Sequence, residues 1–135
     1  MEYTDAMRTH TMTYNNLGVY FKMLKKQNQA IKYLKQVLVI EQAMLVNDSV
    51  EVTEICQTHV NICTIYSEMG KHEIALVYAK EAVRILEIEY DKKEVEGFTS
   101  ETDKFQHCSL VATAFHNAAV EYEHTKDYSS ALIHY

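Results

Sequence analysis

The segment Tyr14–Phe21, which reads YNNLGVYF, recurs in pattern at His59–Tyr66 (HVNICTIY) and at Phe115–Tyr122 (FHNAAVEY). In each copy the fifth residue is small, an aromatic residue follows it after three positions, and an alanine follows it after twelve. The small residues and their alanines form the pairs Gly18 and Ala30, Cys63 and Ala75, and Ala119 and Ala131. Two antiparallel helices approach closely where both carry small side chains, and larger residues spaced three and four apart fill the remaining gap. The pattern therefore predicts three helical hairpins.

The turns of these hairpins can be placed on the same frame. We expect them at residues 25–28, 70–72 and 126–128. Gly70 fits a left-handed turn residue. Apolar positions continue at helical spacing through residues 28–46 and 74–90, which predicts long second helices, and the polar segment 91–101 is expected to be the longest connection. Because a single hairpin cannot bury both of its faces, the hairpins must stack. The chain is thus predicted to be an all-α solenoid of about six helices.

The composition argues against several other classes of protein. The 135 residues suffice for one domain, and 47 % of them are apolar, which is too many for a disordered chain. The absence of proline and the presence of only three glycines favour long helices over a loop-rich β-sandwich. A formal net charge of −6 argues against nucleic-acid binding, and no apolar run approaches the roughly 20 residues of a membrane span. Three cysteines without a CxxC motif predict free thiols in a reducing compartment.

The repeated frame resembles the tetratricopeptide repeat, in which a large residue precedes Leu-Gly and is followed by an aromatic residue and two small residues. The copies cover about residues 11–46, 56–90 and 112–135, within one domain that spans residues 1–135. They lack that family's proline and its tryptophan. Cys63 follows Gly18 by 45 positions and Ala119 follows Cys63 by 56, whereas the family's repeat is about 34 residues long. The third copy is cut short at Tyr135, so we expect a longer natural chain or a second subunit that covers this end.

Three asparagines, Asn16, Asn61 and Asn117, occupy one position of the frame. An amide side chain both donates and accepts hydrogen bonds, so stacked copies could hold the backbone of an extended peptide. An ordinary alternative is that each asparagine satisfies a local backbone group. The same asparagine and the long repeats are similar to kinesin light chain and to spindle-orientation adaptors. That resemblance implies that these three residues contact an extended partner segment on the concave side of the solenoid.

The frame also gives the other concave positions. They are Met12, Val19, Lys22, Met23, Gln57, Thr64, Ser67, Glu68, Thr113, His116, Val120, Glu123 and His124. The N-terminal end of this surface is therefore expected to be apolar and basic, and its C-terminal end acidic and rich in histidine. Chaperone-binding members of the family hold a C-terminal carboxylate with Lys and Arg, and of the matching positions here only Asn61 agrees. With no basic residue to balance a buried carboxylate, chaperone tails are not expected to bind.

No catalytic or metal chemistry is predicted. The chain has no glycine-rich phosphate loop, G-x-S-x-G or HExxH motif. His116 and His124 lie eight positions apart, but a metal site needs three or four converging ligands. Glu121 and Glu123 flank Tyr122 and are expected to be solvated. We therefore predict no enzyme, no metal and no cofactor.

Two functions remain open from the sequence. The first is a cytoplasmic interaction module that holds a partner segment in its concave groove. The alternative is a structural subunit of a large cytoskeletal or ciliary assembly, packed through its convex and end surfaces. The asparagine series favours the first, whereas the irregular repeat spacing and the apolar C-terminal end favour the second. In both cases the partners are proteins, not nucleic acid or membrane.

Overall fold

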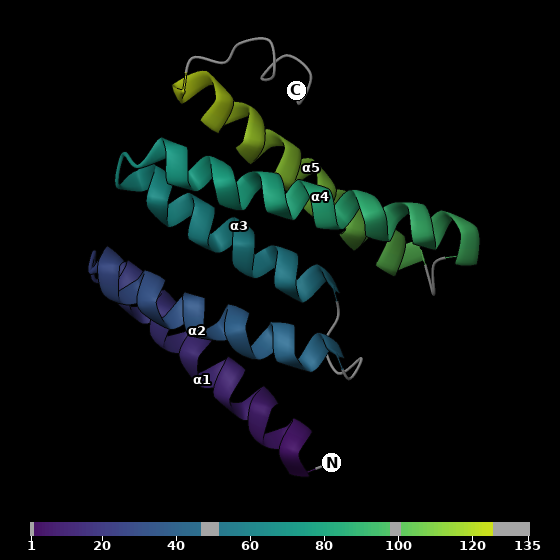
Figure 1. Cartoon of the computed structure of the whole chain (residues 1–135), viewed down its shortest axis with the longest axis horizontal. Helices are drawn as coiled ribbons and strands as arrows, with labels where there is room; N and C mark the ends of the chain where they lie inside the picture. Colours follow the sequence, from purple (N-terminus) through teal and green to yellow (C-terminus); the bar gives the residue numbers. More distant parts are fainter. Residues whose placement is uncertain (1, 47–51, 98–100, 126–135) are drawn as a thin grey trace.

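The computed structural model describes residues 2–46, 52–97 and 101–125. The five helices are α1 (Glu2–Met23), α2 (Gln27–Val46), α3 (Val52–Glu68), α4 (His72–Glu96) and α5 (Glu101–His124). Consecutive helices pack against each other, and α5 also contacts α3, so the hairpins stack side by side (Figure 1). The all-α helical repeat architecture is confirmed, with no strand in the described residues. The predicted sixth helix and its packing residue, Ala131, lie outside them.

The two hairpin turns have the same backbone geometry. After α1, Lys25 adopts φ 62°, its N–H donates to the Lys22 carbonyl, and the next N–H donates to the carbonyl of Phe21. After α3, Gly70 adopts φ 77° and the corresponding bonds run to Ser67 and Tyr66. Both turns are Schellman motifs, which satisfy the last carbonyls of a helix with one left-handed residue. The predicted left-handed conformation of Gly70 is confirmed.

The second helices are long, as predicted, with 20 residues in α2 and 25 in α4. The prediction that residues 91–101 form the longest connection is wrong in its first half, because α4 continues to Glu96. Lysine and glutamate are good helix formers, and this segment holds no helix breaker before Gly97. Gly97 has φ 91°, which ends the helix. Asp91 and Lys92 are exposed on this part of α4.

The small residues of the frame lie where the helices meet. Ala30, Cys63, Ala75 and Ala119 are completely buried. At Gly18 the helices approach closely, because a Cβ atom at this position would lie 2.9 Å from the Leu34 Cγ and 3.5 Å from the Ala30 carbonyl oxygen. A side chain on α1 at this point would therefore force the Leu34 side chain to shift.

Aromatic and lysine side chains repeat the same contacts in successive hairpins. Phe21 stacks on Tyr33 at 5.5 Å between ring centroids, and 45 positions later Tyr66 stacks on Tyr78 at 5.8 Å. Between hairpins, Lys35 Nζ lies 5.5 Å from the ring centroid of Tyr66. The equivalent lysine of α4, Lys80, lies 5.2 Å from Tyr122 of α5. The third copy of the frame therefore docks on the second much as the second docks on the first.

Candidate functional site

A groove of about 390 Å³ lies between α1, α2 and α3. Its apolar lining consists of Met12 from α1 and Val37 and Met44 from α2. Its polar lining consists of Arg8, Thr11 and Asn15 from α1, Glu41 from α2, and Glu54, Gln57, Thr58 and Asn61 from α3. Apolar walls with a few amide and charged groups are typical of a binding site.

Glu41 is the unusual member of this lining, because its side chain is only 3 % exposed. The hydroxyl of Thr58 donates to Glu41 Oε1 over 2.7 Å and also lies 3.1 Å from the carbonyl oxygen of Glu54. The pKa of Glu41 is raised to about 7, mainly by burial and also by the negative charge of Glu54, against the opposing effect of the hydrogen bond from Thr58. Near neutral pH the groove therefore holds a carboxyl group that changes charge easily.

Asn61 is half-buried in the same lining. Its Oδ1 accepts a hydrogen bond of 3.0 Å from Nε2 of Gln57, one helical turn earlier. This bond uses one of the two acceptor positions of the Asn61 amide oxygen. The donor side, the Nδ2 hydrogens, is the part of this side chain that can bind a peptide carbonyl.

The structure distributes the other predicted groove residues over α1, α3 and α5. Asn16 is exposed on α1 and Asn117 is half-buried on α5, and neither lines this groove. The same holds for Val19, Lys22, Met23, Thr64, His116 and Val120. Thr64 Oγ1 donates to the Val60 carbonyl, 3.0 Å away. Of the wider set of expected concave positions, Met12 and Gln57 do line the groove.

Glu41 was not among the predicted site residues. The lining of the groove carries two carboxylates, Glu41 and Glu54, against one guanidinium, that of Arg8, and the predicted basic residue Lys22 lies outside this lining. The frame assigns core positions to the second helix of each hairpin, so it predicts no site residue on α2. The signal that could have found Glu41 is a charged residue at a frame position that holds Leu86 in the next hairpin.

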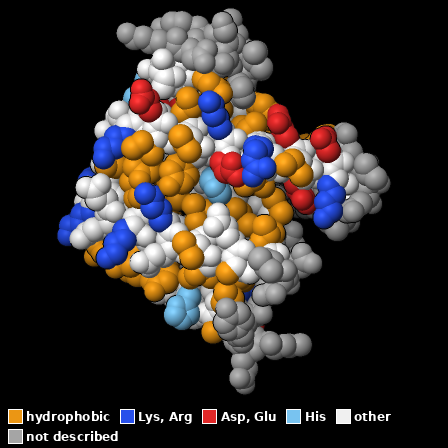
Figure 2. Space-filling model, viewed as in Figure 1, with side chains coloured by type: hydrophobic (Ala, Val, Ile, Leu, Met, Phe, Trp, Pro, Cys, Tyr) orange, Lys and Arg blue, Asp and Glu red, His pale blue; other side chains and the backbone are white. Residues whose placement is uncertain are grey.

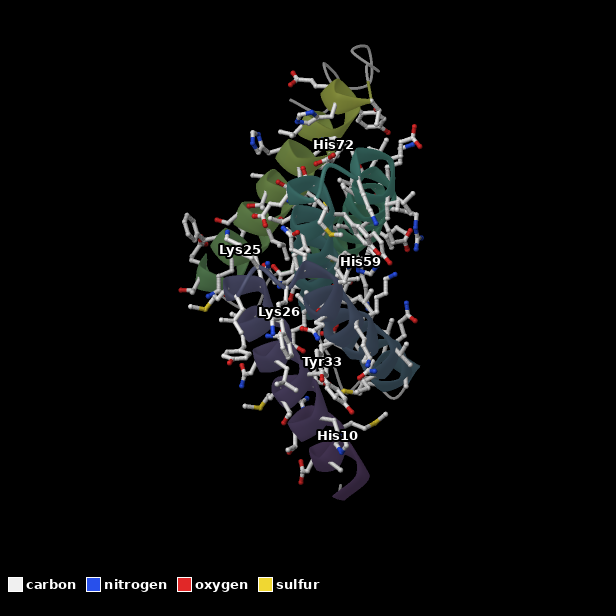
Figure 3. All side chains as sticks on the ribbon, turned by 90° about the vertical axis from the view of Figure 1, so that its left-hand side faces the viewer. His10, Lys25, Lys26, Tyr33, His59 and His72 are labelled. Carbon is white, nitrogen blue, oxygen red and sulfur yellow. The ribbon has the colours of Figure 1, made fainter. Side chains whose placement is uncertain are left out.

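A second polar cluster lies at the opposite end of the described molecule, where Figure 3 labels His72 far from His10. His72 Nδ1 lies 2.8 Å from Glu121 Oε2, and the His124 ring stacks on His72 with centroids 3.9 Å apart. The prediction that Glu121 is solvated is wrong, because its side chain is 2 % exposed. Across the part of the chain that the structure describes, no three His, Cys, Asp or Glu side chains are placed to hold a metal ion.

The cysteines are free thiols, as predicted. Cys56 and Cys63 are buried in the core, and burial raises the pKa of each thiol to about 12. Both therefore remain protonated and unreactive at neutral pH. None of the described helices combines the length and the apolar character that crossing a membrane requires.

Comparison with known proteins agrees with the frame. Residues 11–50, which include the second half of α1 and all of α2, match the family model of the tetratricopeptide repeat. The search of curated proteins finds no match to the chain. The matched segment contains the Gly18 contact, the Schellman turn and the α2 wall of the groove. The first hairpin is thus similar to a tetratricopeptide repeat, and the helices that follow pack onto it in sequence order.

Proposed function

We propose that this protein is a non-enzymatic scaffold that holds an extended segment of a partner protein in the groove between α1, α2 and α3. Tetratricopeptide repeats generally mediate protein–protein interaction, so the match over residues 11–50 supports the general role. The groove itself is the observation that supports the specific binding mode. We further propose that the protein acts in the cytoplasm, in agreement with its free thiols.

The dimensions and the lining of the groove suit an extended peptide. A volume of about 390 Å³ holds a few residues. Met12 and Met44 are flexible, polarisable side chains that adapt to different apolar partners. Gln57 and Asn61 are joined by a hydrogen bond on α3 and offer amide groups for the peptide backbone. A peptide held through its backbone needs no particular sequence at those points.

Selection from a display library of random 12-residue peptides tests this proposal. Binders are selected on the purified chain, and their dissociation constants are measured by fluorescence anisotropy. Asn61→Ala should weaken them about 3- to 10-fold, the effect of one lost hydrogen bond. Asn28→Ala makes the same chemical change at an exposed position outside the groove and should leave the affinity unchanged. Equal affinities for both variants would contradict binding in the groove.

The alternative, a structural subunit of a cytoskeletal or ciliary assembly, is favoured by exposed apolar side chains. Figure 2 shows hydrophobic side chains spread over one face of the molecule. The most exposed large hydrophobic side chains in the described residues are Met12, Met23, Val39, Val77, Ile88 and Phe105. Assembly through such surfaces would be unaffected by Asn61→Ala and would fail in Val39→Ser or Val77→Ser. Peptide binding in the groove would be weakened by Asn61→Ala and unaffected by the two valine substitutions.

A further inference from the structure

Comparison of the two interfaces between hairpins identifies Glu41 as a residue that the fold does not require. Glu41 precedes Leu86 by 45 positions, the same shift that relates Gly18 to Cys63. Leu86 is completely buried, and Glu41 is 3 % exposed. The facing helix shows the same exchange of a polar residue for an apolar one, because Thr58 occupies the frame position at which the third copy has the buried residue Ala114. The second interface is thus packed with Leu and Ala where the first has Glu and Thr.

A buried carboxyl group is costly to fold, since its charged form loses hydration. Leucine solves the same packing problem in the next hairpin without that cost. The hydrogen bond from Thr58 satisfies part of the carboxylate, which can accept about four hydrogen bonds in total. Among the described residues, the structure shows one hydrogen bond to the Glu41 carboxylate, the bond from Thr58. Because the Glu41 side chain lines the groove, a group bound there could use the remaining capacity of the carboxylate.

The neighbours of Glu41 suit a positive charge on a long aliphatic stem. Glu54 contributes a second carboxylate to the same lining, near enough for its charge to act on Glu41. Met12 and Met44 add apolar surface beside the two carboxylates. Lysine and arginine side chains combine an apolar stem with a charged end. Their charge would relieve the repulsion between Glu41 and Glu54.

We propose that the groove binds a basic side chain, lysine or arginine, of the extended partner segment, with its charged end at Glu41 and Glu54 and its stem against Met12 and Met44. This inference rests on the proposed function and adds the chemistry of the partner. Arg8 also lines the groove and is exposed. Its charge opposes the incoming cation, so Arg8→Gln should strengthen binding.

The experiment is a parallel selection of random 12-residue peptides on the wild-type chain and on Glu41→Leu, which copies the second interface. Peptides selected on the wild type should be enriched in Lys or Arg at one position, and those selected on Glu41→Leu should not. For one selected peptide, Glu41→Leu should weaken binding about tenfold or more, as should replacement of its basic residue by norleucine. The two changes together should weaken binding no further than either one alone.

Controls separate this inference from the proposed function. Glu87→Leu removes an exposed carboxylate of α4 outside the groove and should leave the affinity unchanged. If Glu41→Leu fails to fold by circular dichroism, Glu41→Gln replaces it. Binders without a basic residue that still respond to Asn61→Ala would overturn this inference alone. If no peptide binds, or if Asn61→Ala has no effect on binding, the proposed function fails as well.

The pH dependence of binding gives a second readout. The charged and titratable groups near Glu41 are Arg8 and Glu54, which share the groove lining with it, and Cys56 of α3, whose thiol is affected by the charge of Glu41. Because a cation favours the charged carboxylate, the affinity should rise several-fold between pH 6 and pH 8, as Glu41 loses its proton. The Glu41→Leu variant should not show this rise. An affinity that falls over this range, or the same rise in the variant, would overturn the assignment of Glu41.

Discussion

Lys25 and Gly70 occupy the same position of two Schellman turns, but only one of them is suited to it. A left-handed conformation costs a non-glycine residue roughly 1–2 kcal/mol, while glycine adopts it freely. We expect Lys25→Gly to raise the free energy of unfolding by about 0.5–1 kcal/mol, and Gly70→Ala to lower it by a similar amount. No atom lies within 4 Å of a Cβ placed at Gly70, so the stability lost in Gly70→Ala would come from backbone conformation and not from a steric clash. Urea denaturation measures both, and a destabilising Lys25→Gly would contradict the turn assignment.

Glu41 should make the stability of the fold depend on pH. Its pKa is raised from 4.5 to about 7 in the folded chain, so the folded state favours the neutral form. The stabilisation by this proton is complete below the unfolded pKa and is lost as the pH rises through about 7. Glu41→Leu should therefore gain about 2 kcal/mol more over the wild type at pH 8 than at pH 5.

Urea denaturation of Glu41→Leu and the wild type at both pH values measures this difference. Glu87→Leu removes an exposed carboxylate and serves as the control, with no such dependence expected. A gain for Glu41→Leu that is equal at pH 5 and pH 8 would mean that Glu41 keeps the pKa of a solvated glutamate.

At the residue level, the sequence predicted positions that depend on local geometry and missed those that depend on neighbours. The conformation of Gly70 follows from the turn in which it lies. The burial of Glu41 and Glu121 follows from residues 17 and 49 positions away in the chain, Thr58 and His72. Charge alone indicates solvent exposure, so both carboxylates could be found only from their places in the repeated frame.

Among the elements, α5 is joined to α4 by a polar contact that the preceding interface lacks. Glu121 is buried against His72, whereas the second hairpin has Ile65 at the equivalent position. His72→Ala should lower the free energy of unfolding by about 1–3 kcal/mol, because it leaves a buried carboxylate without its partner. The double variant with Glu121→Ile should recover most of this loss.

Hydrogen exchange of α5 measures the effect where it should occur. Faster exchange in α5 is expected for His72→Ala, with little change in α1. Lys71→Ala, which changes the exposed neighbour of His72, is the matched control. An unchanged α5 in His72→Ala would contradict a role for the Glu121 contact in docking this helix.

The helices themselves were predictable because hydrophobic spacing and small residues act locally. Their ends were less so, as α4 shows by continuing to Glu96 through a polar segment. The contacts of Lys35 with Tyr66 and of Lys80 with Tyr122 were not predicted. A lysine on an exposed helix face gives no signal of its aromatic neighbour until the relative placement of the two hairpins is known.

For the whole molecule, three copies of one frame predicted the stacked architecture, and the unusual spacing of 45 and 56 residues accompanies long helices, with 20 residues in α2, 25 in α4 and 24 in α5. The groove was harder to predict. Its walls come from three helices, and α2 contributes Glu41, Val37 and Met44 from positions that a frame based on α1 and α3 treats as core. The series Asn16, Asn61 and Asn117 remains a prediction, with Asn61 in the groove.

The most direct test of the groove is the NMR spectrum of methyl-labelled methionine during titration with a selected peptide. Met12 and Met44 line the groove, while Met69 lies at the turn end of the molecule. We expect the methyl signals of Met12 and Met44 to shift as peptide is added, with titration curves that give the peptide's dissociation constant. The methyl signal of Met69 should stay unchanged. Shifts at Met69 without any at Met12 or Met44 would contradict binding between the first and second hairpins.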